Sequence, residues 1–500
     1  MAETGIVFTN SITGKREAFA PIEKGKVTFY SCGPTVYDLI HIGNLRAALV
    51  ADLIYRFLKS RGFEVNYVRN YTDIDDKIID RAAKDGVSAD VIAKKFTTEV
   101  EKDYAAAGLL EPTHKTKATE HVPQMIAMIE TLVQKGSAYA IPGGDVFFSI
   151  GGFAKYGYLS GKSKDDLLTG VRIEVDPTKR DPLDFALWKA AKPGEPAWPS
   201  PWGNGRPGWH IECSAMARKW LGDQIDLHHG GQDLVFPHHE NEIAQSEACT
   251  GKHPFVKTWL HHAFITVSKQ KMAKSVGNVF TARDFLTKFG GEFARYAFLS
   301  VHYRQPLDFT DELMEQSLTG LERIYEAKRR ALELSKRKQG LADPRAETAW
   351  GEFAASAQKA RTEIAKEWNT DLNSAGVLGS VFSLIREFNR TLTSPRAEMT
   401  PAAGIGAQLL VDTIESDLGE VLGVGRMMPE TVLTKLQEIR QALRGAAPTL
   451  AADAIEKKIQ ERLDARKAKD FKRADAIRDE LAAGGVEIKD SPQGTTWRYS

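Results

Sequence analysis

The sequence comprises 500 residues with a formal net charge of +1, of which 42% are hydrophobic and 27% are charged. Such a chain is too long for one hydrophobic core, so we expect about two to four globular domains. It has no run close to the roughly 18 apolar residues of a membrane helix, and its start, MAETGIVFTNSITGKREAF, lacks the pattern of a signal or transit peptide. We therefore expect a cytoplasmic protein without a membrane partner, in which any nucleic-acid surface comes from local clustering of charge.

The first predicted elements form a strand–helix–strand unit. KVTFYSC (residues 26–32) alternates like a strand, and residues 42–62 show helical periodicity that closes on Lys59, Arg61 and Gly62. FEVNYVRNY (residues 63–71) is predicted as the next strand. This unit is the building block of a parallel nucleotide-binding sheet.

A second unit of the same kind is predicted much later in the chain. QIDLHHG (residues 224–230) and TWLHHAFITV (residues 258–267) are its strands, and a helix begins at Pro237 between them. Residues 115–222, which are rich in Gly, Pro and Trp, would be inserted between the two halves of the sheet.

The helix predicted from Pro237 carries a possible pair of metal ligands. His238 and Glu242 are four residues apart and share one face, whereas His239 pairs with Ile243 on a more apolar side. An imidazole and a carboxylate so placed can ligate zinc together with two further ligands. For this stretch alone, a solvated polar helix face is the more common alternative.

The three cysteines, Cys32, Cys213 and Cys249, are too few for a disulfide framework. We interpret Cys249 as a buried small hydrophobe. Cys32 and Cys213 each end an apolar or aromatic stretch beside glycine or polar residues. Because no C-x-x-C spacing is present, their pattern alone leaves zinc binding open.

The rest of the chain is predicted to be mainly helical. Residues 313–339, the segment after Trp350 and residues 371–392 show periodic apolar positions, joined by connections at 342–347 and 394–401. From about residue 448 a small module of two charged helices and a short strand follows. Between Ile455 and Arg478 nine Lys or Arg stand against five Asp or Glu, which fits either a solvated face or an RNA-binding one.

Two loops lie beyond the carboxyl ends of strands, where ligands bind in open α/β sheets. In CGPTVYDLIHIGN, His41 and Asn44 stand at a helix start and could meet phosphate oxygens, helped by free N–H groups. In KQKMAKSVGN, Lys271 and Lys274 could neutralise the charge that develops on a phosphoryl group. The two loops belong to opposite halves of the split sheet.

These motifs resemble those of class I aminoacyl-tRNA synthetases, since HIGN resembles the HIGH signature and KMAKS the KMSKS signature. More specifically, the chain resembles the cysteinyl-tRNA synthetase family over essentially its whole length. The stretches that carry the resemblance are CGPTVYDLIHIG, TDIDDKII (72–79), ATEHV (118–122), DFALWK (184–189), GRPGWHIECSAM (205–216), FPHHENEIAQSEA (236–248), RADAIRDEL (473–481) and DSPQGTTWR (490–498).

The resemblance implies an α/β fold with a Rossmann-like split parallel sheet, an inserted connective region, a C-terminal helical bundle and a small α+β tail module. The implied domain limits are 1–114 and 223–310 for the two catalytic halves, 115–222 for the connective region, 311–445 for the tRNA-binding bundle and 446–500 for an anticodon-recognition module. The implied reaction is activation of L-cysteine with ATP and transfer to tRNA(Cys), and we expect a monomer.

The resemblance also implies site residues. One zinc ion per chain would be held by Cys32, Cys213, His238 and Glu242. The cysteine pocket would contain Thr72, Trp209 and His228. ATP, together with Mg²⁺, would meet His41, Asn44, Asp233 and Lys274, and the catalytic residues would be His41, Asn44, Lys271 and Lys274. Arg466, Asp475, Asp490 and Trp497 would read or position the anticodon of the tRNA.

Two positions depart from the family signatures. Asn44 replaces the second histidine of HIGH, and Ala273 replaces the serine of KMSKS. An amide can still donate a hydrogen bond, and both lysines of the second motif are kept. We therefore expect only modest effects of these departures on the reaction rate.

Three alternatives are weighed against this interpretation. The nearest is a cysteine ligase of the mycothiol pathway, which joins cysteine to an amino-sugar and lacks the C-terminal helical region with its tail. A zinc hydrolase would need H-E-x-x-H, whereas the stretch reads HHENE. A non-catalytic RNA-binding relative would need neither the two lysines nor the four zinc-ligand positions.

Overall fold

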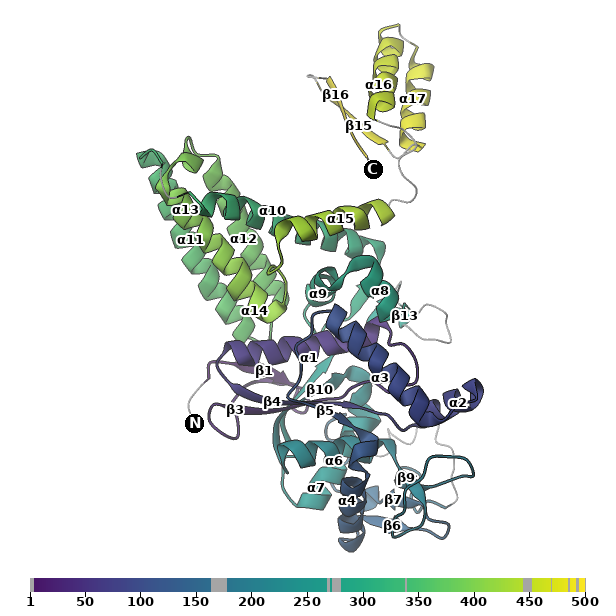
Figure 1. Ribbon diagram of the computed structural model, residues 1–500. Coiled ribbons are helices and arrows are strands. Elements are labelled where there is room, and N and C mark those ends of the chain that lie inside the picture. Colours follow the sequence, from purple (N-terminus) through teal and green to yellow (C-terminus); the bar gives the residue numbers. More distant parts are fainter. Residues whose placement is uncertain are drawn as a thin grey trace. The chain divides into compact units, whose positions relative to one another are not determined.

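The computed structural model describes residues 4–162, 178–267, 270–271, 280–337, 340–443, 452–468, 470–483, 486–491 and 494–499. The chain divides into two compact units, Met1–Pro429 and Glu430–Ser500, and Figure 1 labels their helices and strands. None of the helices in the described part of the chain combines the length and the hydropathy that crossing a bilayer requires.

The first unit is built on a parallel sheet in the order β11-β10-β3-β4-β5. Its strands are β3 (Lys26–Ser31), β4 (Glu64–Tyr71), β5 (His114–Lys117), β10 (Ile225–Gly231) and β11 (Val256–His262). The two predicted strand–helix–strand units lie side by side in it, because β10 pairs in parallel with β3, Leu227 opposite Phe29. The split parallel sheet predicted from the sequence is therefore confirmed.

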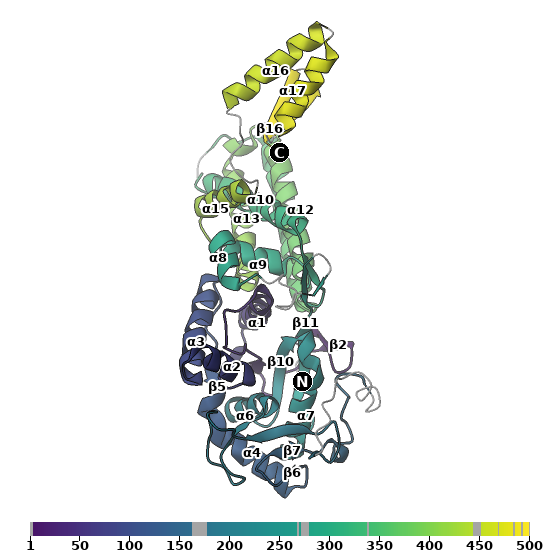
Figure 2. The ribbon, with the colours of Figure 1, turned by 90° about the vertical axis from the view of Figure 1, so that its right-hand side faces the viewer.

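Helices cover both faces of this sheet, as the nearly continuous burial of its central strands requires. Figures 1 and 2 show α1 (Ile42–Ser60) and α3 (Ala89–Ala106) on one side, and α6 (Trp209–Leu221) and α7 (Glu240–Thr250) on the other. The short helix α2 (Asp76–Asp85) precedes α3.

The chain between β5 and α6 builds a smaller layer. It contains η1 (Ala118–His121), α4 (Val122–Gln134), η2 (Ile150–Gly152) and an antiparallel sheet of β6 (Ala138–Ala140), β7 (Val146–Phe148), β8 (Phe185–Ala190) and β9 (Gly205–Pro207). Side chains of α4 and this sheet, such as Met125, Phe148 and Trp188, share one hydrophobic core with Met216 of α6. A hairpin of β1 (Val7–Asn10) and β2 (Lys15–Ala18) stands at the start of the unit.

The strand predicted over residues 258–267 is in fact two strands. β11 ends at His262, and β12 (Ile265–Val267) belongs to another small sheet in the order β13-β12-β14, with β13 (Gln270–Lys271) and β14 (Leu307–Phe309). The chain changes sheets at Ala263 and Phe264, and neither glycine nor proline marks that point in the sequence. After β13, which contains Lys271, the chain continues with helices α8 (Ala282–Phe289) and α9 (Gly291–Leu299).

The predicted long helices are present, as α10 (Asp311–Ser335), α11 (Pro344–Asn369) and α12 (Ser374–Leu392). They are followed by η6 (Ala397–Met399), α13 (Pro401–Asp412), η7 (Thr413–Leu418) and α14 (Gly419–Leu422). Helix α11 begins inside the predicted connection 342–347, because Asp343 caps it by accepting from the N–H groups of Arg345 and Ala346, and Pro344 suits its first position.

The second unit consists of α15 (Pro429–Leu443), α16 (Ala452–Lys467), α17 (Phe471–Ala483), β15 (Val486–Ser491) and β16 (Gly494–Tyr499). The two charged helices and the strand predicted here are confirmed, and β16 adds an antiparallel partner for β15. A small core of Ile455, Ile459, Ile477, Leu481 and Val486 holds the helices on the strands, and Trp497 packs against it.

Candidate metal centre and active site

Side chains of metal-binding type meet where β3 and β10 end. Cys32 follows β3, Cys213 lies on α6, and His238 and Glu242 come from the turn and helix after β10. The Sγ atom of Cys32 lies 3.8 Å from Sγ of Cys213 and 3.8 Å from Oε1 of Glu242, which in turn lies 3.1 Å from Nε2 of His238. One donor atom from each of the four lies within 4.8 Å of all the others, so a single ion could bind them together.

His238 and Glu242 contact each other as their spacing predicts, although no regular helix begins at Pro237. Residues Val235–His239 form a wide turn in which Phe236 is extended (φ −137°, ψ 132°), and the α-helix begins at Glu240. The wide turn still places His238 above Glu242, at 2% and 0% exposure. The solvated helix face, the common alternative for this stretch, is therefore wrong.

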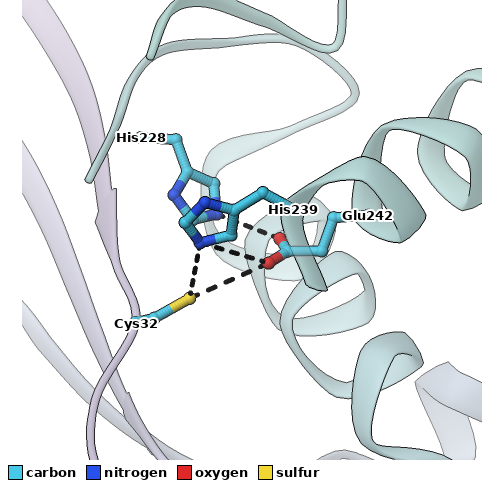
Figure 3. Close-up of side chains that lie close together, drawn as sticks. All are labelled: Cys32, His228, His239 and Glu242. Carbon is cyan, nitrogen blue, oxygen red and sulfur yellow. Dashed lines mark hydrogen bonds and ion pairs between the residues drawn. The ribbon is translucent and has the colours of Figure 1, made fainter. Parts of the chain in front are cut away.

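A second set of donors shares two of these residues. In Figure 3, Cys32 and His228 lie on either side of His239 and Glu242. The Sγ atom of Cys32 is 3.5 Å from Nε2 of His239, and Nε2 of His228 is 3.0 Å from the other carboxylate oxygen of Glu242, Oε2. Cys32, His228, His239 and Glu242 thus also have donor atoms within 4.8 Å of one another. Because Cys32 and Glu242 belong to both sets, the two sets describe one centre. Its imidazoles, those of His228, His238 and His239, are more than the one that the predicted set of four ligands uses.

His239 was expected on a more apolar side with Ile243, and this interpretation is wrong. Its Nδ1 lies 2.7 Å from Nε2 of His261, and its ring is completely buried beside the sulfur of Cys32. Gly230 allows this approach, because a Cβ atom there would lie 2.5 Å from Cε1 of His239. The first glycine after HH in the strand is thus explained by His239, whereas the second, Gly231, leaves room for the carboxylate of Asp233, 2.4 Å from where its Cβ atom would lie.

A further chain of buried histidines runs beneath the cluster. Oγ of Ser31 lies 3.0 Å from Nδ1 of His229, whose Nε2 lies 3.1 Å from Nδ1 of His262. Burial lowers the pKa values of His229, His239 and His261 well below the usual range, so these rings are neutral. The sequence carried a signal for them, since HH occurs at 228–229, 238–239 and 261–262.

The charges of the cluster are set by its own members. Burial raises the pKa of the Cys32 thiol well above the usual range, while the hydrogen bond from Cys32 lowers the pKa of Cys213 to about 6. Burial also raises the pKa of Glu242 and lowers that of His238, but their mutual attraction and their neighbours His228 and Cys213 outweigh it. The pKa of Glu242 is therefore about 2 and that of His238 about 10.

Two soft thiols, an imidazole and a carboxylate are a donor set that fits zinc. The Cys213 thiolate and the Glu242 carboxylate supply negative charge without further deprotonation. His238 would give up its proton to the solvent when a metal ion takes its Nε2 atom. The cluster is thus chemically suited to the ion that the resemblance implied.

Beside the cluster lies a pocket of about 390 Å³. Cys32 and Trp209 line it at the metal end, His41 and Asn44 line it at the start of α1, and Asp233 lines it beyond β10. Trp209 stacks on His238 with ring centroids 4.4 Å apart. Of the three residues expected around cysteine, Trp209 lines the pocket, whereas Thr72 and His228 are buried at 2% and 0% exposure and do not line it.

His41 and Asn44 cap helix α1 reciprocally. Nδ1 of His41 accepts hydrogen bonds from the N–H groups of Gly43 and Asn44, and the Asn44 side chain accepts one from the N–H of His41. The N–H groups expected to be free for phosphate are therefore already bonded in this structure. The loop after β3 packs closely on β4 at Gly33. Only glycine fits there, because a Cβ atom would lie 1.7 Å from the carbonyl oxygen of Asn70.

The remaining predicted residues are placed as follows. The backbone of Lys271 pairs with Thr266 in the small sheet, and Lys274, like Ala273, lies outside the described residues. Arg466 lies on α16, Asp475 on α17, and Asp490 and Trp497 on the paired strands β15 and β16.

Comparison with known proteins gives the family. Residues 18–319 match the family model described as the tRNA synthetases class I (C) catalytic domain, and residues 450–498 match the cysteinyl-tRNA ligase anticodon binding domain. A cysteine–tRNA ligase of Geotalea uraniireducens is 47% identical over 499 residues, covering 98% of each chain. This chain belongs to the cysteine–tRNA ligase family. A family member from Geobacter sulfurreducens is 48% identical over 489 residues, again covering 98% of each chain.

The fold of this cysteine–tRNA ligase family member is also found in solved structures. Mycobacterium tuberculosis methionyl-tRNA synthetase in complex with methionyl-adenylate superposes with a TM-score of 0.61 at 14% identity, covering 85% of this chain and 94% of that one. At that identity the likeness concerns the fold alone. It confirms the class I synthetase fold inferred from HIGN and KMAKS.

Proposed function

We propose that this chain activates L-cysteine with ATP and transfers the cysteinyl group to tRNA(Cys). The observation that carries the proposal is the meeting of two sites in one pocket. A thiol-rich cluster of metal ligands lies at one end, and the capped start of α1, with the HIGN motif, lies at the other. A substrate with a thiol and a carboxylate could therefore reach both at once.

We propose Cys32, Cys213, His238 and Glu242 as the ligands of one zinc ion per chain. Zinc, when bound there, would supply a soft Lewis acid that favours a thiolate over a hydroxyl group. Trp209, stacked on His238, would close the thiol end against water, and the buried Thr72 and His228 would support that end from below.

At the other end of the pocket, the chain would bind ATP with Mg²⁺. Asp233 would accept hydrogen bonds from the ribose, while His41, Asn44 and the lysines Lys271 and Lys274 would face the phosphates. The cysteine carboxylate would attack the α-phosphorus and pyrophosphate would leave. A ribose hydroxyl of the tRNA would then attack the carbonyl carbon of the adenylate, and AMP would leave.

The tRNA acceptor is supported by the second unit. A mycothiol-pathway ligase would have no use for the anticodon-binding match over residues 450–498. We propose Arg466, Asp475, Asp490 and Trp497 as its RNA contacts, with the domain limits given above, and a cytoplasmic monomer as the working form. Bases in a single-stranded loop can be read by their edges and by stacking.

An ATP–pyrophosphate exchange assay tests this proposal. Cysteine should support exchange in the absence of tRNA, and tRNA(Cys) should then accept the cysteinyl group, whereas serine should support very little exchange. If cysteine were activated but passed only to an amino-sugar, the mycothiol-type alternative would be correct. If no amino acid supported exchange, the proposal would be wrong.

A further inference from the structure

Arg46 is a buried cation whose hydrogen bonds, within the described part of the chain, all go to backbone carbonyls. It lies on α1, two residues after Asn44, and is 0% exposed. Its Nη1 atom donates to the carbonyls of Ala263 (2.8 Å) and Phe264 (2.9 Å), and its Nη2 atom donates to that of Gln305 (2.8 Å). Among the described residues it forms no ion pair, and its buried Nε atom has no hydrogen-bond partner.

The three carbonyls belong to the base of the small sheet β13-β12-β14. Ala263 and Phe264 form the turn that leads into β12, and Gln305 precedes β14. β12 pairs on one side with β14 and on the other with β13, where Thr266 lies opposite Lys271. One guanidinium therefore holds both chain segments that enter this sheet.

The same part of α1 is also bonded to the chain just after the lysine motif. The N–H of Ile42 donates to the carbonyl of Phe280 (3.1 Å), and the N–H of Ala282 donates to the carbonyl of Ile40 (2.7 Å). His41 and Thr281 form an isolated β-bridge there. The segment with HIGN thus holds the described chain on both sides of the lysine motif.

A buried charge without a carboxylate partner is costly, and an apolar side chain would fill the same space at lower cost. What a guanidinium adds is a planar fork of donors that can fix two separate segments at once, which a lysine ammonium does not reproduce. Burial lowers its pKa to about 10, so the group remains charged at neutral pH in the wall of the pocket.

We infer that Arg46 is a positioning residue for cysteine activation, which holds the small sheet, and with it the backbone of Lys271, in a fixed place against the helix that carries His41 and Asn44. The inference rests on the proposed function, since it concerns the rate of the first step. It assigns no contact with substrate to Arg46 itself.

The test compares Arg46→Lys with Arg295→Lys. Arg295 is a matched control, because it is 2% exposed and also donates to a backbone carbonyl, that of Leu422, but pairs with Asp52 and does not line the pocket. Misplacing reacting groups by about 1 Å can cost about 100-fold in rate. We therefore expect Arg46→Lys to lower the exchange kcat about 10- to 100-fold, with KM for cysteine and ATP changed less than about threefold.

Zinc content should stay at the wild-type level in both variants, and Arg295→Lys should lose thermal stability but keep its kcat. In Arg46→Lys, amide hydrogen exchange should become faster in Ile265–Val267 and Leu307–Phe309, whereas the exchange rates of β3 should stay at the wild-type level. An unchanged kcat, or an equal loss in both variants, would overturn the inference, as would an Arg46→Lys chain that fails to fold while Arg295→Lys folds. If the wild type did not activate cysteine, the proposed function would fail first.

Discussion

If Cys32, Cys213, His238 and Glu242 hold zinc as proposed, their donor atoms bear directly on the choice between cysteine and serine. The two amino acids differ by one atom, and a hydrophobic pocket rejects such a near-isostere by only about 10². Protein synthesis needs roughly 10⁴–10⁵, and the larger figure corresponds to about 7 kcal/mol of differential transition-state binding. A centre with two thiol ligands can supply the difference, since its metal would prefer a third sulfur to a hydroxyl oxygen.

The variant Cys213→Ser should lose metal and cysteine activation together, because a serine hydroxyl at this buried position stays protonated and binds zinc poorly. Metal content by elemental analysis and pyrophosphate exchange should fall in parallel. Cys249→Ser is the control, since Cys249 is also buried but contacts Arg218 away from the centre. A metal-free preparation that activated cysteine at the full rate and still rejected serine would refute this role.

Lys274→Ala should lower the activation kcat about 10²–10³-fold while KM for ATP changes little, because in the proposed mechanism its ammonium would meet phosphate charge that grows in the transition state. Single-turnover formation of the adenylate would measure this directly. Lys288→Ala, an exposed lysine on α8, should leave the rate unchanged. A rise in KM alone would instead assign Lys274 to ground-state binding.

Among single residues, the sequence predicted those that belong to recognisable motifs. It did not predict residues such as Arg46, whose partners are backbone carbonyls. Cys32 and Cys213 could be joined to His238 and Glu242 only through the family resemblance, because they are distant in the chain. Arg46 gives no signal in the sequence, because nothing in the helical pattern distinguishes a buried arginine from a solvated one in a helix whose other buried positions are mostly apolar. Its partners are carbonyls more than 200 residues away, as in the pair with Ala263, and no sequence pattern marks such an acceptor.

Among the elements, α1 contributes to both the pocket and the buried core. Besides its capped start, it carries Asp52, one oxygen of which accepts hydrogen bonds from Arg56 Nε and Arg295 Nη2, both at 2.6 Å. The other oxygen accepts from the N–H of Leu110 at 2.7 Å. Asp52 thereby connects α1, α9 and the chain before β5 in a buried network at 2% exposure.

Asp52→Asn should therefore destabilise the first unit strongly. Removing one partner of a buried pair leaves the other charge uncompensated, which costs about 3–5 kcal/mol. The measurement is the urea midpoint of that unit, followed by the near-ultraviolet signal of its tryptophans. Glu326→Gln, which removes the partner of exposed Arg329 on α10, should leave the midpoint nearly unchanged. Equal shifts in the two variants would show that the Asp52 network contributes no more than a surface pair.

Whole elements were predicted best where the period of the apolar residues was regular, as in α1, α10 and α12. The strand run 258–267 was predicted as one element because its apolar residues continue through the turn at Ala263 and Phe264. Tertiary contacts mark that turn, namely the hydrogen bonds of its carbonyls with Arg46 and those of Ala263 with Tyr303 and of Phe264 with Leu307. The wide turn Val235–His239 was missed for a related reason, since helical spacing continues through it.

On the scale of the whole molecule, the division into Met1–Pro429 and Glu430–Ser500 suggests separable tasks. The proposed metal centre and the pocket lie entirely in the first unit. The match to an anticodon binding domain lies entirely in the second. Each unit also has its own hydrophobic core.

A chain truncated after Leu443 should keep cysteine activation near the wild-type rate and lose most of its tRNA charging. Pyrophosphate exchange and aminoacylation, measured on the same preparation, separate the two activities. Zinc content and the thermal transition of the first unit serve as the folding control. Equal loss of both activities in a folded truncated chain would contradict this division of tasks.

The strand order of the parallel sheet has a consequence for synthesis on the ribosome. β10 lies between β11 and β3, yet roughly 190 residues separate the end of β3 at Ser31 from the start of β10 at Ile225. At a synthesis rate of about 5–20 residues per second, β10 emerges about 10–40 s after β3, which until then can pair only with β4. During that interval one of its edges is open to pairing with other chains. The layer built by residues between β5 and α6 emerges in the same interval, so a nascent chain that stalls there exposes both the open edge and the unpartnered Cys32.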